Sequence, residues 1–79
     1  MVYVVVSSHH MYSRYLEVFG ENPKTHKIAT EYNLRGLPRE TTIILYEDYY
    51  NNLEWMAMNT IIFNRFYNVF ILCSRELKS

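Results

Sequence analysis

The sequence contains few of the residues that cross-link, bend or break a chain. Its 79 residues include one cysteine, two glycines and two prolines. A single cysteine excludes an internal disulfide, so we expect a reducing compartment, and the cytoplasm is the simplest location. A chain of this length has room for one hydrophobic core, which predicts a single domain over residues 1–79.

The sequence also lacks an excess of charge of either sign, because eight Lys and Arg balance eight Asp and Glu. Nucleic acids and anionic membranes are bound through clusters of positive charge, so this balance disfavours both as partners. The apolar residues 2–6 are followed at once by four polar residues and have no basic segment before them. This stretch is too short for a signal peptide or a membrane span.

Alanine is scarce too, occurring only at Ala29 and Ala57, whereas tyrosine occurs eight times. Codons for Tyr, Asn and Ile are rich in A and T, and codons for Gly and Ala are rich in G and C. This bias is typical of an AT-rich genome, such as those of many phages. It predicts a phage-encoded protein and carries no information about activity.

Three short apolar runs, residues 2–6, 41–46 and 69–73, have the composition of strands that are covered on both faces. Residues 26–30 form a weaker candidate strand. Two helices separate the strong strands. The first covers residues 11–19 after a serine cap and before Gly20, and the second covers residues 53–66 after Asn51 or Asn52.

The order of these elements, β-α-(β)-β-α-β, predicts an α/β fold. Strands that alternate with helices are joined by right-handed crossovers, which place the strands in parallel. We therefore expect a small, mainly parallel sheet of three to four strands with two helices. Residues 31–40 contain Gly36 and Pro38 and are expected to form an irregular connection.

Polar residues follow each strong strand and would meet at one edge of a parallel sheet, where such folds bind ligands. Residues 43–48, a buried strand ending in adjacent acids, resemble the Mg²⁺-coordinating strand of P-loop ATPases of the RecA-like type. That resemblance implies a nucleotide site. However, residues 7–10 lack the glycines and lysine of a phosphate-binding loop. The resemblance therefore implies a degenerate module, and we expect no cofactor.

Aromatic residues are the most unusual feature of the chain. Tyr49 and Tyr50 are adjacent and cannot easily both turn inward, so at least one should be exposed. Protein interfaces favour Tyr, Trp and Met. We therefore predict a partner-binding surface formed by Tyr49, Tyr50, Trp55 and Met58.

These features favour a small non-enzymatic interaction protein that binds and modulates, for example inhibits, a host protein. A first alternative is a degenerate nucleotide- or metal-binding module, and a second is a self-assembling dimer formed through the two-sided second helix. The residues of the ligand-binding alternative are Ser8, His9, His10, Glu47, Asp48 and Arg75. Adjacent histidines seldom point at one ion, so no metal ligands are assigned.

Overall fold

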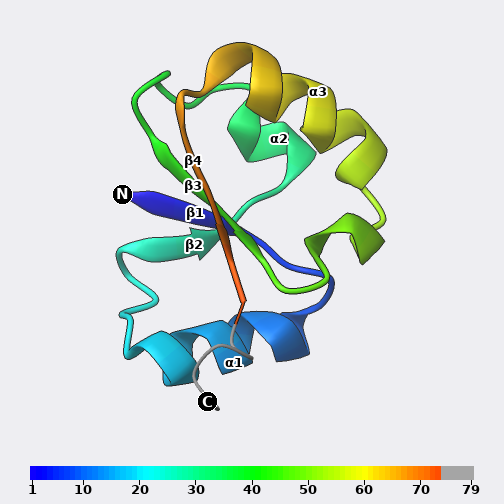
Figure 1. The fold of residues 1–79 in the computed structure, drawn as a ribbon. Helices are drawn as coiled ribbons and strands as arrows, with labels where there is room; N and C mark the ends of the chain where they lie inside the picture. The colour runs from blue at the N-terminus through cyan, green and yellow to red at the C-terminus, as the bar shows by residue number, and fades with distance from the viewer. Residues whose placement is uncertain (74–79) are drawn as a thin grey trace.

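The computed structural model describes residues 1–73, which form a four-stranded, all-parallel sheet with the strand order β2-β1-β3-β4 (Figure 1). The α/β fold predicted from the sequence is confirmed, and the weak candidate strand joins the sheet as the edge strand β2. The strands are β1 Val2–Val5, β2 His26–Ile28, β3 Thr42–Tyr46 and β4 Asn68–Leu72.

Helices cover both faces of this sheet. Helix α1 (His9–Phe19) lies on one face, and α2 (Glu31–Leu34) and α3 (Trp55–Arg65) lie on the other (Figure 1). The strand order explains this arrangement. From β1 the chain first crosses to β2 on one side of it, and then crosses back in the opposite direction to β3 and on to β4. Right-handed crossovers in opposite directions place their helices on opposite faces.

The first helix has both ends marked as the sequence predicted. Its cap is Ser8, whose Oγ accepts a hydrogen bond from the Met11 N–H at 3.4 Å. Gly20 ends the helix in the left-handed conformation, with φ of 63°, which glycine adopts without steric cost.

Two local predictions were wrong. The irregular segment contains the short helix α2, since Thr30 and Asn33 form a reciprocal capping box with hydrogen bonds of 2.9 and 3.1 Å. The second long helix begins at Trp55, two residues later than expected. A 3₁₀ turn, η1 (Tyr49–Asn51), precedes it, and Leu53 is left fully exposed.

Burial on both faces explains why the strands are continuously apolar. Along β3, Ile43 and Leu45 pack toward α2 and α3, whereas Ile44 and Tyr46 pack toward α1. All four are buried. Within residues 1–73, no helix has both the length and the apolar character needed to cross a membrane.

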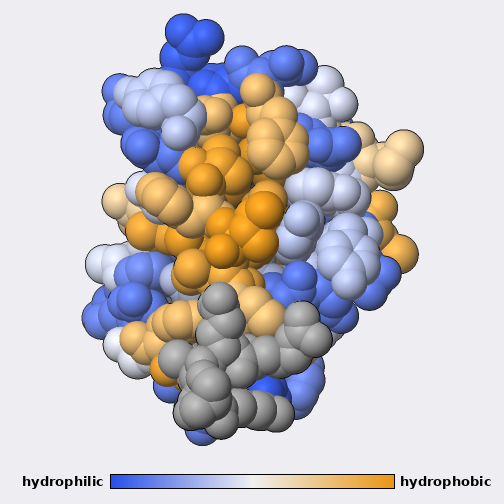
Figure 2. Space-filling view, viewed as in Figure 1, coloured by the Kyte–Doolittle hydropathy of each residue, from blue (hydrophilic) through white to orange (hydrophobic). Residues whose placement is uncertain are grey.

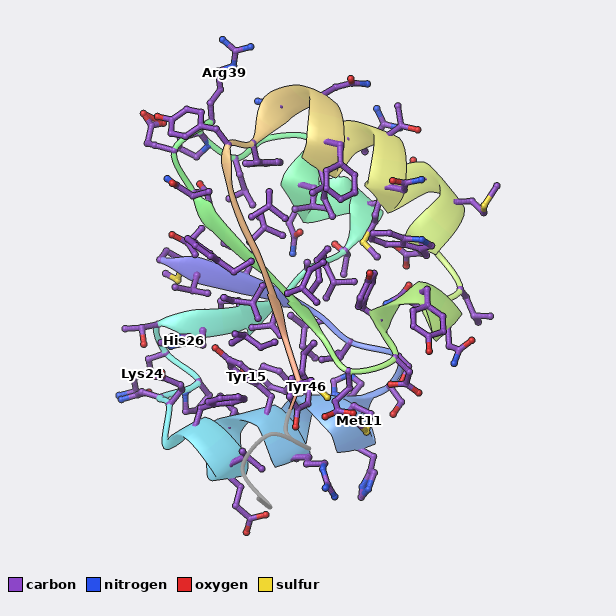
Figure 3. All side chains as sticks on the ribbon, viewed as in Figure 1. Met11, Tyr15, Lys24, His26, Arg39 and Tyr46 are labelled. Atoms are coloured by element: carbon purple, nitrogen blue, oxygen red, sulfur yellow. The ribbon has the colours of Figure 1, made fainter. Side chains whose placement is uncertain are left out.

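The α1 side of the core combines aromatic rings with the aliphatic side chains of Val4, Val6 and Ile44. Tyr46 is fully buried and packs edge-on against Tyr15 and Phe19, with ring centroids 5.4 and 5.9 Å apart. Figure 3 shows Tyr15 and Tyr46 close together between α1 and the sheet. Burial raises the pKa of Tyr15 to about 12, with smaller contributions from Glu21 and Tyr12. Tyr15 is itself buried and its ring packs against those of Phe19 and Tyr46.

Candidate functional site

The carboxyl edge of the sheet brings together residues that are far apart in the sequence. Because β1 and β3 are neighbours, the loops that follow them meet. There the Ser7 Oγ donates a hydrogen bond to Asp48 Oδ1 at 2.9 Å. The juxtaposition expected at this edge is thus present for the first and third strands.

Asn52 ties the same edge to the start of α3. Its Nδ2 donates to the carbonyl oxygen of Val6 at 2.7 Å, and its Oδ1 accepts from the Glu54 N–H at 2.7 Å. The sequence predicted Asn51 or Asn52 as the cap of this helix. Instead Asn52 joins the end of β1 to the turn before the helix, across 46 positions in the sequence.

A shallow pocket of about 150 Å³ lies at this edge, between the ends of β1 and β2. The Glu54 carboxylate lines it and accepts a hydrogen bond from the Glu31 N–H, at the start of α2, at 2.7 Å. A helix start is where a phosphate group would find free N–H donors. Here a carboxylate of the chain itself takes one of these donors and adds negative charge, which disfavours an anionic ligand.

Of the other residues of the ligand-binding alternative, Ser8 and His9 line the same pocket as Glu54. Both are exposed, as is His10, at the start of α1, and Arg75 lies outside the described residues. Glu47 adopts a φ of 53°, an uncommon conformation for a residue other than glycine. In the part of the chain that the structure describes, no group of three or more His, Cys, Asp and Glu side chains could hold a metal ion.

We expect ATP or ADP with Mg²⁺, at millimolar concentration, to leave the melting temperature of this protein unchanged. The reason is the combination of a carboxylate at the pocket with a loop that lacks glycine and lysine. Thermal unfolding followed by circular dichroism checks this, with sucrose as a control that raises the melting temperature by preferential exclusion. A ligand at a hundred times its dissociation constant adds about 2.7 kcal/mol, so a rise of several degrees with nucleotide would contradict the expectation.

Four aromatic rings form a chain of edge-to-face contacts from η1 along α3, here called the aromatic ladder. It runs Tyr50–Tyr49–Trp55–Phe63, with successive ring centroids 5.4, 5.0 and 6.4 Å apart. Tyr49 and Trp55 are half-buried and pack against the core. Tyr50 is 59% exposed and Phe63 is 57% exposed, so both ends of the ladder reach solvent.

The position of Met58 was predicted wrongly. It is fully buried and, with Ile62 one turn later, faces the core, so it cannot contact a partner. Apolar residues surround this helix, and their spacing alone did not show which face turns inward. Phe63, which the sequence marked only as one of many aromatics, takes its place on the surface.

The strand β4 carries a second apolar surface that the sequence did not indicate. Phe70 is 52% exposed and Ile71 is 66% exposed, and they point to opposite faces of the sheet. Figure 2 shows a continuous apolar band running down this side of the molecule, where Figure 1 places β4. The sequence predicted residues 69–73 as a strand covered on both faces, so this exposure was not expected.

No protein-family model matches the chain, and searches of curated proteins and of solved structures likewise gave no match. We therefore infer the function from the geometry of the chain itself.

Proposed function

We propose that this protein is a non-enzymatic protein-binding module whose aromatic ladder contacts the partner. The observation that carries the proposal is the ladder itself, a row of four edge-to-face rings with exposed ends. Tyr and Trp are the residues most enriched at the energetic centres of protein interfaces.

The two middle rings of the ladder are held in place by the hydrophobic core, which favours binding. Tyr49 and Trp55 pack against the core cluster that includes Met58 and Ile62. Rings held in place before a partner arrives lose little conformational freedom on binding, and this lowers the cost of association. Two further apolar side chains of the same segment of the chain are exposed, Leu53 fully and Met56 at 83%.

The composition supports a biological setting for this proposal. A small chain rich in Tyr, Asn and Ile and poor in Gly and Ala fits a phage-encoded modulator of a host protein. Inhibition follows simply if the ladder covers a surface that the host protein needs.

We expect Tyr50→Ala and Phe63→Ala each to weaken capture of a stoichiometric partner from a bacterial lysate by about tenfold or more. Each change removes an exposed end of the ladder, and truncating a central interface aromatic typically costs more than about 1.4 kcal/mol, which is a factor of ten. Affinity is measured by titrating immobilised protein against the identified partner.

Tyr32→Ala is the matched control. Tyr32 is 90% exposed on α2 and is not part of the ladder, so capture should be unchanged. All three variants should melt at the temperature of the parent protein. Equal loss of capture in the control, or full capture by both ladder variants, would exclude this surface.

A further inference from the structure

The two edges of the sheet are built differently. The edge strand β2 has three residues and includes Lys27, an exposed charge, and Pro23 lies just before it. Short length and a charged side chain are devices that prevent an edge from pairing with another strand. This edge is protected.

The opposite edge has none of these devices. Strand β4 has five residues, Asn68–Leu72, without a charge, a proline or a glycine. It pairs with β3 on one side only, and no other strand of residues 1–73 lies on its outer side. Strand β4 lies at the edge of the sheet, but its apolar composition is that of a central strand, which has a hydrogen-bonded neighbour on each side.

We propose that β4 pairs in antiparallel fashion with β4 of a second copy of this chain, forming a continuous eight-stranded sheet about a two-fold axis. A five-residue strand that pairs over its full length with its own copy is centred on its third residue, Phe70. The two Phe70 side chains then lie opposite each other on the α1 face. Ile71 lies opposite Val69 of the second copy on the α2 and α3 face.

This pairing covers the exposed apolar side chains of β4 without any other molecule. Phe70 lies opposite Phe70, and Ile71 lies opposite Val69, so the centre of the pairing is apolar on both faces. Asn68, the only polar residue of the strand, lies opposite Leu72 at each end. Tyr67, Phe70 and Ile71 are each at least half exposed. Side chains of this size expose on the order of 100 Å² each, so two copies contribute roughly 600 Å² before the strand backbones are added. That total approaches the roughly 1,000 Å² of a specific interface.

A second copy fits this edge better than a foreign strand does. Partner strands are selected by charges and pockets along the edge, and β4 offers no charge to select one. An uncharged strand is compatible with itself, and a two-fold interface uses the same patch twice.

The test measures the mass of the full chain by sedimentation equilibrium over a range of concentrations. We expect a dimer of twice the 9.6 kDa chain mass. Ile71→Lys should raise the dissociation constant at least a hundredfold, because it places a charge in the joined sheet. Leu53→Lys, at a fully exposed position outside the strand, should leave the dimer unchanged. Ile71 is already two-thirds exposed, so its variant should remain folded.

A cross-link tests the register. In the Phe70→Cys, Cys73→Ser variant the two introduced thiols lie opposite each other, with Cα atoms about 4.5–5.5 Å apart, which is within reach of a disulfide. Mild oxidation should therefore link two chains. The matched Tyr50→Cys, Cys73→Ser variant should not form the link.

Three results would overturn the proposal: a monomer at all concentrations, whether or not it binds a foreign strand along β4, a dimer that resists Ile71→Lys, or no cross-link at position 70. Tyr50→Ala should leave the dimer intact, so this test and the test of the ladder fail independently.

Discussion

We expect Leu45→Ala to lower the free energy of unfolding by about 2–5 kcal/mol. Leu45 lies in β3, the strand between β1 and β4, and is fully buried against the cluster under α2 and α3. Truncating it removes apolar contacts and leaves a cavity that the sheet cannot close, because the strand has neighbours on both sides. Small domains are stable by only about 5–15 kcal/mol, so this single change would populate unfolded chains measurably.

Leu53→Ala is the control for that measurement, because it makes the same chemical change at a side chain that is fully exposed. Its effect should be less than about 0.5 kcal/mol. Urea denaturation followed by circular dichroism measures both values. Similar losses in the two variants would show that the core is not organised as described.

Asn52→Ala should lower the free energy of unfolding by about 2 kcal/mol. The change removes the hydrogen bond from Asn52 Nδ2 to the carbonyl oxygen of Val6, and Val6 is 2% exposed. A buried carbonyl that loses its partner costs about 1–3 kcal/mol. The bond from the Glu54 N–H is lost as well, which loosens the turn before α3.

The neighbouring residue provides a matched control. Asn51 is exposed in η1, and its backbone N–H keeps its bond to the Asp48 carbonyl whatever the side chain is. Asn51→Ala should therefore change stability by less than about 0.5 kcal/mol. If both variants lost the same amount, the bridge from β1 to α3 would not contribute to stability.

The sequence predicted the fold well because strands covered on both faces have a distinctive composition. The run around Ile43 and Leu45, the cap at Ser8 and the stop at Gly20 are local signals, and the structure follows them. Helix α2 was missed because its capping box depends on two side chains, Thr30 and Asn33, within a segment whose Gly36 and Pro38 suggest a loop.

The candidate surface was harder to predict, because exposure depends on tertiary packing. Tyr50 is exposed as expected, but the sequence does not show which face of an all-round apolar helix turns inward. The predicted partner-binding surface therefore included the buried Met58 and not the exposed Phe63. The exposure of Phe70 and Ile71 had no local signal, since it follows from the position of β4 at the end of the strand order.

The contrast between Lys27 on β2 and the uncharged β4 also sets a limit on growth. A sheet whose two edge strands can both pair with another chain adds chain after chain and becomes a fibre. A sheet with one such edge stops at two chains, because both ends of the joined sheet are then the charged edge. Lys27 is one of the features that protect this edge, beside the short length of β2 and Pro23 before it, and Lys27→Val is the substitution that would shift such a dimer toward filaments.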